Sequence, residues 1–152
     1  MIQYFKGDVL ESLNNTPTPK VLLHICNNMG GWGKGFVTAI SKKWPQPERV
    51  FRDCYNLKLA NNLGDIQVCS IDNVHIINMV AQNGYKNKPN PIPLDYAALD
   101  CCLSKVESFL KTFENSPSIF CPKIGTGLAG GDWKIISEML NAHLDNVNVY
   151  EL

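Results

Sequence analysis

Apolar residues along the chain follow two periodicities that alternate from one segment to the next. Runs of strand length that are continuously or alternately apolar predict β-strands, and apolar residues that recur every three or four positions predict amphipathic helices. The predicted strands cover residues 2–5, 21–26, 66–71, 74–80, 118–121 and 147–150. The helical stripes are Phe36, Val37, Ile40 and Trp44, then Val50, Phe51, Cys54 and Leu57, then Leu99, Cys102, Leu103, Val106, Phe109, Leu110 and Phe113, and finally Trp133, Ile136, Leu140 and Leu144.

Turn and cap residues separate these elements. Asp8 is a suitable N-cap for a short helical turn over residues 8–13, and Pro47 suits the first turn of the second helix. Asp72 and Asn73 predict a hairpin between two adjacent strands.

The order of the elements predicts the fold class. Strands alternate with helices except at the hairpin, so we expect one α/β domain over residues 1–152, a three-layer α/β/α sandwich around a mixed sheet. Central strands that are buried on both faces explain why residues 21–26 are almost continuously apolar.

Composition agrees with one folded domain and narrows its partners. The chain has 152 residues, of which 45% are hydrophobic and 18% charged. Lys and Arg number 14, as do Asp and Glu, and a net charge of zero argues against a protein that grips nucleic acid or an anionic membrane. No apolar run approaches the roughly 18 residues of a membrane-spanning helix, and the first residues lack the pattern of a signal peptide.

The neutral total conceals a basic segment. Residues 33–60 contain six basic and two acidic residues, a local charge of +4. A solvated helix face accounts for this charge; the alternative is that it steers an anionic ligand toward the preceding loop. The basic residues are Lys34, Lys42, Lys43, Arg49, Arg52 and Lys58, and the acidic ones are Glu48 and Asp53.

The cysteines show neither a disulfide pattern nor a metal-binding pattern. The sequence has no C-x-x-C motif, and no cysteine pairs with a histidine at zinc-ligand spacing. We therefore expect no metal, and free thiols in a reducing cytoplasm. The cysteines are Cys26, Cys54, Cys69, Cys101, Cys102 and Cys121.

Two glycine-rich loops carry the chemical information. Residues 27–35 and residues 125–132 each follow a predicted strand and precede a predicted helix. Ligands of α/β sheets bind where loops leave the carboxyl ends of strands, and glycines let backbone N–H groups approach a phosphate. The pair of loops predicts a two-ended or diphosphate-containing ligand. Neither loop has the Walker pattern or a dinucleotide-binding fingerprint, which argues against a P-loop NTPase or a dinucleotide dehydrogenase.

Three segments in this order resemble the macro domain family over nearly the whole chain. They are Lys6-Gly7-Asp8-Val9, then His24-Ile25-Cys26-Asn27 running into Gly30-Gly31-Trp32-Gly33-Lys34-Gly35, and then Pro122-Lys123-Ile124-Gly125-Thr126-Gly127-Leu128. The His-x-Cys-Asn strand, the Gly-x-Trp-Gly-x-Gly loop and a tryptophan soon after the second loop are most similar to one branch. That branch contains ADP-ribose 1''-phosphate phosphatases and the terminal ADP-ribose glycohydrolase.

The resemblance implies ADP-ribose or a derivative as the ligand. It implies that Asp8 accepts a hydrogen bond from the adenine amino group and that the backbone N–H of Val9 contacts the adenine. The role of Asp8 as a helix N-cap remains open. Asn27 would orient the distal ribose, and Phe36 would face the ligand unless it is an ordinary core residue of its helix. The residues implied to line the distal ribose and diphosphate are Gly31, Gly33, Gly35, Phe36, Gly125, Thr126, Gly127, Leu128 and Ala129.

Three positions differ from the better-known members of the family. His24 stands where the wider family often has Asn, and Gln82 and Ala129 replace a lysine and an aspartate of the glycohydrolase. These differences argue against a covalent lysine–ribose intermediate and leave hydrolysis by water. His24 is then the candidate to activate or orient the water, with a hydrogen-bonded strand histidine as the alternative. Lys86 and Lys88 are interpreted as solvated loop charges.

We expect a cytoplasmic, monomeric hydrolase that acts on the distal ribose of ADP-ribose derivatives and uses no cofactor. ADP-ribose 1''-phosphate is the first expected substrate, followed by ADP-ribosyl esters of carboxylates, and Asn27 and His24 are the predicted catalytic residues. The alternatives are a non-catalytic ADP-ribose reader, which Gln82 and Ala129 favour, and an unrelated nucleotide-binding sandwich. Neither membrane nor nucleic-acid binding is expected.

Overall fold

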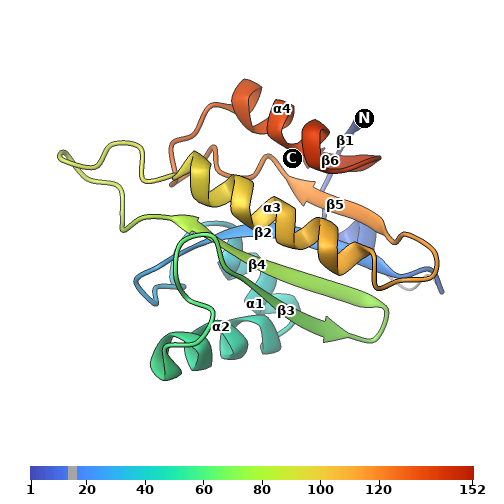
Figure 1. Cartoon of the computed structure of the whole chain (residues 1–152), viewed down its shortest axis with the longest axis horizontal. Helices are drawn as coiled ribbons and strands as arrows, with labels where there is room; N and C mark the ends of the chain where they lie inside the picture. The colour runs from blue at the N-terminus through green and yellow to red at the C-terminus, as the bar shows by residue number, and fades with distance from the viewer. Residues whose placement is uncertain (14–16) are drawn as a thin grey trace.

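Six strands form one mixed sheet in the computed structural model, which describes residues 1–13 and 17–152 (Figure 1). The strand order is β1-β6-β5-β2-β4-β3. The strands are β1 (Ile2–Lys6), β2 (Lys20–Asn27), β3 (Ile66–Ile71), β4 (Val74–Gln82), β5 (Ser118–Pro122) and β6 (Val147–Glu151). The helices are a short 3-10 helix, η1 (Glu11–Leu13), and α1 (Phe36–Lys43), α2 (Gln46–Leu57), α3 (Tyr96–Leu110) and α4 (Trp133–His143).

Each strand and helix that the apolar pattern predicts is present and in the predicted order. The predicted hairpin turn joins β3 to β4, and Asp72 in this turn has a φ of 52°. Most ends agree with the prediction to within one residue, and two differ by more. β4 continues to Gln82 because it pairs in parallel with all of β2, as far as the pair formed with Asn27. α3 ends at Leu110, so Phe113 lies in the turn that follows.

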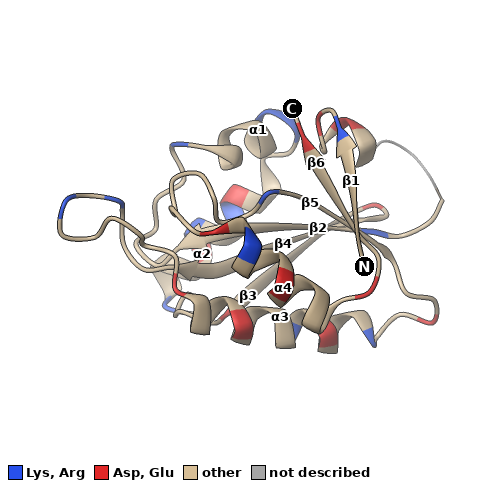
Figure 2. Cartoon of the chain, turned by 90° about the horizontal axis from the view of Figure 1, so that it is seen from above, with Lys and Arg blue, Asp and Glu red and all other residues tan. Residues whose placement is uncertain are grey.

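Helices cover both faces of the sheet, which confirms the three-layer α/β/α fold (Figure 2). β3 and β4 are antiparallel, and the other neighbouring strands are parallel, so the sheet is mixed as expected. α3 and α4 pack on one face of the sheet, and η1, α1 and α2 pack on the other.

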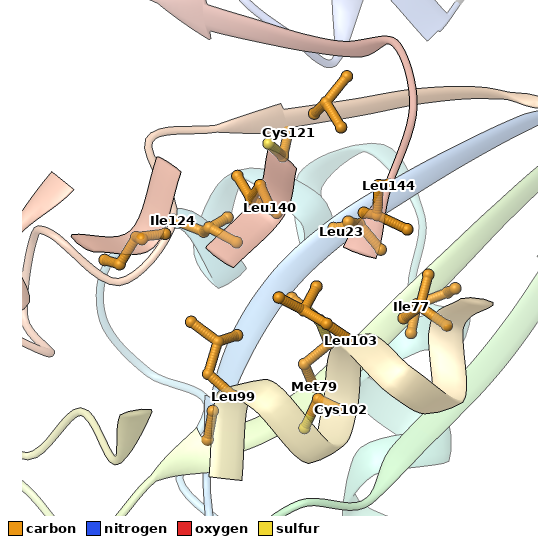
Figure 3. Packing of buried hydrophobic residues seen from close by; sticks show 14 of the residues in the cluster. Leu23, Ile77, Met79, Leu99, Cys102, Leu103, Cys121, Ile124, Leu140 and Leu144 are labelled. Carbon is orange, nitrogen blue, oxygen red and sulfur yellow. The ribbon is translucent and has the colours of Figure 1, made fainter. Parts of the chain in front are cut away.

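The core on the α3–α4 face is built around the two central strands (Figure 3). Leu23 of β2 and Ile77 of β4 point toward Leu99 and Leu103 of α3 and Leu140 of α4. All five side chains are fully buried. Burial of such side chains is the main stabilising contribution to the fold.

The opposite face has a second core that begins one residue away in the same strand. Leu22 of β2 and Ile76 of β4 pack with Ile40 of α1, Phe51 of α2 and Trp32 of the first glycine loop. Successive residues of a strand point to opposite faces, so β2 needs apolar residues at nearly every position. The predicted burial of the central strands on both faces is therefore confirmed.

All six cysteines are free thiols. Burial raises the pKa of Cys121 to about 12, and burial likewise raises the pKa of Cys102 to about 12, so neither is a reactive thiolate at neutral pH. Cys101 is exposed on α3. In the described part of the chain, no helix combines the length and apolar character needed to cross a membrane.

We expect Leu103→Ala to lower the free energy of unfolding by about 2–5 kcal/mol, because it removes a fully buried side chain from between α3 and the sheet. Urea denaturation monitored by circular dichroism measures the change. The matched control is Leu57→Ala at the exposed end of α2, where a loss within about 0.5 kcal/mol is expected. Equal losses in the two variants would contradict this description of the core.

Candidate functional site

Three neighbouring parallel strands end at the same edge of the sheet. β5 ends at Pro122, β2 at Asn27 and β4 at Gln82, and β2 lies between the other two. The chain leaves β2 toward α1 on one face and leaves β5 toward α4 on the other face. Adjacent parallel strands whose connections diverge in this way open a crevice between their loops, which is the usual ligand site of an α/β sheet.

Two adjoining cavities lie at this edge, with volumes of about 400 and 460 Å³. They share Ile25, Lys34, Val37, Gln82 and Leu128, so one continuous cleft runs from the first glycine loop to the second. The smaller cavity is also lined by Cys26, Asn27, Gly31, Gly33, Tyr85 and Lys86. The larger is also lined by His24, Gly35, Phe36, Pro122, Lys123, Ile124, Gly125, Thr126, Gly127 and Ala129.

Asn27 and Trp32 hold the first glycine loop in place. The Asn27 Oδ1 accepts hydrogen bonds from the backbone N–H groups of Met29 (2.9 Å) and Gly31 (3.1 Å), and its Nδ2 donates to the Gly31 carbonyl (2.8 Å). Trp32 is 4% exposed, and its Nε1 donates to the Ser41 Oγ at 2.6 Å. The loop is therefore anchored at both the strand end and the helical layer.

The glycines of the two loops divide into packed and open positions. A Cβ on Gly31 would lie 2.2 Å from the Tyr85 Oη, and a Cβ on Gly131 would lie 2.4 Å from Leu94 Cδ2. A Cβ on Gly33 or Gly127 would meet nothing within 4 Å. The fold requires Gly131, because a Cβ there would also lie 2.7 Å from the Gly125 carbonyl oxygen, whereas the contact at Gly31 is only with the end of the exposed Tyr85 side chain. Gly33 and Gly127 leave room for a ligand beside the backbone.

Close packing of its glycines against the core shapes the second glycine loop. Gly125 has a φ of 76°, and a Cβ there would lie 3.0 Å from Ile136 Cδ1. The Gly131 N–H closes the loop by donating to the Gly125 carbonyl at 2.7 Å. Asp132 caps α4 by accepting a hydrogen bond from the Lys134 N–H at 2.9 Å.

His24 is buried between the sheet and the α1–α2 layer, and it also borders the larger cavity. Its side chain is on the α1–α2 face of β2, is 2% exposed and lies edge-on to Trp32, with ring centroids 5.5 Å apart. Its Nε2 lies 2.5 Å from the Oδ1 of Asn78 on β4, and Asn78 in turn donates to the Gln67 Oε1 at 3.1 Å. Burial lowers the pKa of His24 to about 4, and the hydrogen bond with Asn78 only partly opposes this effect. The geometry favours the hydrogen-bonded strand histidine over a base that activates water.

The charge of the cleft is positive. Lys34 and Lys86 line the smaller cavity, and none of the ion pairs or hydrogen bonds of the described residues involves either ammonium group. Lys123 lines the larger cavity and forms an ion pair with Glu151. Among residues 1–13 and 17–152, no Asp or Glu lines either cavity. The cleft is therefore suited to an anionic ligand.

Comparison with known proteins identifies the family. No protein-family model matches the chain. A macrodomain protein from Streptomyces coelicolor has a similar structure, with 33% sequence identity, a TM-score of 0.84, and coverage of 100% of this chain and 99% of that one. The chain belongs to the macrodomain family.

Two further relatives span the whole macrodomain. The ADP-ribose 1''-phosphate phosphatase of Candida albicans is 29% identical over 99% of both chains. A protein of unknown function from Bacteroides thetaiotaomicron is 37% identical, with a TM-score of 0.90 and coverage of 100% of this chain and 98% of that one. The resemblance inferred from the three sequence segments is thus confirmed at the level of the family.

The macrodomain brings together most, but not all, of the residues that the sequence singled out. Asn27, Gly31 and Gly33 line one cavity, and Gly35, Phe36 and residues 125–129 line the other. Asp8 and Val9 line neither. They follow β1, the outer strand, which is three strand spacings or about 14 Å from β2.

The contacts of Asp8 and Lys86 bear on two expectations drawn from the sequence. The Asp8 Oδ1 accepts a hydrogen bond from the Leu10 N–H at 2.9 Å, so Asp8 does begin the short helical turn. Lys86 is an exposed loop residue, as the interpretation of a solvated loop charge requires, and it also lines the smaller cavity together with Tyr85. The sequence did not single out Tyr85, which lines the cavity because the sheet order brings the end of β4 beside β2.

We expect His24 to make the macrodomain less stable as the pH falls from about 6.5 to 4. Its pKa is about 4 in the folded protein and about 6.5 in the unfolded chain, so its stabilising contribution is complete above pH 6.5 and is lost through this window. The size of the loss is about 3 kcal/mol. Urea denaturation at pH 7 and pH 4.5 measures it.

The comparison protein for this test is His24→Asn, which has no titrating ring. It should lose less unfolding free energy than the wild type between the two pH values, even if it is less stable at both. Parallel losses in the two proteins would show that His24 is not the group that titrates.

Proposed function

We propose that this macrodomain binds ADP-ribose derivatives in the cleft and hydrolyses the phosphate ester at the distal ribose of ADP-ribose 1''-phosphate. The observation that carries this function is the pair of glycine loops on adjacent parallel strands, with open backbone at Gly33 and Gly127. Relatives named ADP-ribose 1''-phosphate phosphatase, such as those of Candida albicans and Debaryomyces hansenii, support the choice of substrate.

The diphosphate fits between the loops because of the helix that begins there. α1 follows Gly35, and no side chain caps its first N–H groups, so they are available to an anion. At the start of α4, by contrast, the Asp132 carboxylate accepts a hydrogen bond from the Lys134 N–H. The distal ribose then lies toward Asn27, and the adenine lies toward Asp8, whose second carboxylate oxygen remains able to accept a hydrogen bond.

The chemistry relies on positioning rather than on a strong base. Water attacks phosphorus, the bond between phosphorus and the ribose oxygen breaks, and phosphate and ADP-ribose leave. The absence of carboxylates from the lining of the described cavities and the burial of His24 leave Asn27, the loop N–H groups and the lysines to orient and stabilise the reacting group. The six free thiols favour a reducing compartment such as the cytoplasm.

A second candidate function is a non-catalytic ADP-ribose reader. The observation that favours it is the same lack of an ionisable group in the cleft able to act as a base: His24 is buried, and Gln82 and Ala129 cannot take up a proton at neutral pH. A reader binds ADP-ribose and releases no phosphate from the 1''-phosphate, so a turnover assay separates the two functions.

The binding site is tested by Gly33→Val and Gly127→Val. Both positions have open space and ordinary backbone angles, so the variants should fold and fill the cleft. We expect each to raise the Kd for ADP-ribose by at least about tenfold, or about 1.4 kcal/mol, measured by calorimetry. Ser104→Val on the exposed surface of α3 is the control and should bind like the wild type. Unchanged binding in both glycine variants would overturn the proposed site.

The reaction is tested by phosphate release from ADP-ribose 1''-phosphate. Asn27→Ala removes three hydrogen bonds that shape the first loop, so kcat/KM should fall by about 10- to 100-fold. His24→Asn should stay within a few-fold of the wild type, because the His24 ring is buried and its Nε2 is already hydrogen-bonded to Asn78. A fall of about 100-fold or more in His24→Asn would instead identify the histidine as the base. No release by the wild type, with ADP-ribose still bound, would select the reader.

A further inference from the structure

The loop of residues 83–93, which connects β4 to α3, projects beyond the edge of the sheet (Figure 1). Asparagine side chains hold its base against the first glycine loop. The Asn28 Oδ1 accepts a hydrogen bond from the Gly84 N–H at 2.9 Å, and the Asn28 Nδ2 donates to the Asn83 Oδ1 at 3.2 Å. The loop is therefore attached directly to the residue that follows Asn27.

A second asparagine braces the loop from within. The Asn90 Nδ2 donates to the Asn83 carbonyl at 2.9 Å and to the Tyr85 carbonyl at 3.1 Å. The backbone of Asn90 also pairs with that of Asn87 in a tight turn. These contacts define the backbone position of residues 83–90, although most of their side chains are exposed.

The bracing directs two side chains to the smaller cavity. Tyr85 and Lys86 both line it, and the Tyr85 hydroxyl reaches the open face of Gly31, where a Cβ would lie 2.2 Å away. Lys34 enters the same cavity from the first glycine loop. Tyr85 and Lys86 of this loop and Lys34 of the first glycine loop thus all border the cavity that Asn27 lines.

At this end of the cleft, the described residues include lysines but no carboxylate that pairs with them. The loop contains two lysines and no acidic residue. In Figure 2 it carries blue and no red. Within the described residues, neither Lys34 nor Lys86 has a carboxylate partner, and the lining of the cavity includes none. An anion that entered here would gain charge-assisted hydrogen bonds without displacing an existing ion pair.

We propose that Lys86, with Tyr85 and Lys34, forms a subsite that recognises the phosphate on the distal ribose and makes Lys86 a specificity-determining residue. The assignment rests on the proposed function, which places the distal ribose at Asn27. A phosphate monoester carries about −1.5 to −2 charge at neutral pH, whereas a hydroxyl or a carboxylate ester at the same carbon is neutral. The subsite therefore favours the 1''-phosphate over ADP-ribose itself and over ADP-ribosyl esters.

The test compares Lys86→Met with Lys88→Met. Both remove one lysine charge from the same exposed loop, but Lys88 lines neither cavity of the cleft. The Kd of each protein is measured by calorimetry for ADP-ribose and for ADP-ribose 1''-phosphate, the latter at low temperature with a correction for turnover. The KM and kcat for phosphate release are measured in parallel.

We expect the wild type to bind the 1''-phosphate more tightly than ADP-ribose. Lys86→Met should weaken binding of the 1''-phosphate by about tenfold, raise KM by a similar factor, and weaken ADP-ribose binding less than twofold. Lys88→Met should change neither Kd by more than about twofold, since a distant exposed charge contributes little.

Three results would overturn the subsite. They are equal affinity of the wild type for the two ligands, an equal loss for both ligands in Lys86→Met, and matching losses in Lys86→Met and Lys88→Met. In each case the proposed function stands if ADP-ribose still binds. A wild type that binds neither ligand would overturn the proposed function and the subsite together.

Discussion

The pairing of β2 with β5 on one side and with β4 on the other is the constraint on which the rest of the structure depends. It places the ends of three strands, and so both glycine loops and the loop after β4, at one edge of the sheet. It also places β2 in the middle of the sheet, where helices cover both of its faces and connect the site to two separate cores. Because strand side chains alternate, a shift of one residue in this pairing would reverse the two faces and move Asn27 out of the cleft.

Polar side chains give the cleft its shape once the strands are in place. Asn27, Asn28 and Asn90 use amide groups to hold the loops, as backbone N–H and C=O groups do within the sheet. His24 and Asn78 form a further hydrogen-bonded pair in the interior, where a polar group is tolerated only if it is hydrogen-bonded. Such a preorganised site loses little conformational entropy when a ligand binds.

The distribution of charge also suits the proposed chemistry. Carboxylates near a reacting phosphate would repel it. Among the residues that the structure describes, no carboxylate lines the cleft. Two acidic residues at this edge have partners of their own, because Asp132 caps α4 and Glu151 forms an ion pair with Lys123. A basic cleft in a chain of zero net charge concentrates an anionic ligand without making the whole surface attractive to polyanions.

The sequence by itself determined the kinds of element and their order. The spacing of Leu99, Leu103 and Val106 predicts one buried face of a helix, and clustered glycines predict loops. Both predictions succeed because helices and turns depend on residues that are close in the sequence. Its three family segments also located the glycine loops. Only the tertiary structure decided the roles that depend on distance: that the His24 ring is bonded to Asn78, that Tyr85 lies against Gly31 whereas Gly33 is open, and that Lys86 borders the cleft. These outcomes follow from which strands become neighbours and in which register, and no local pattern encodes the contact between residues more than 50 positions apart.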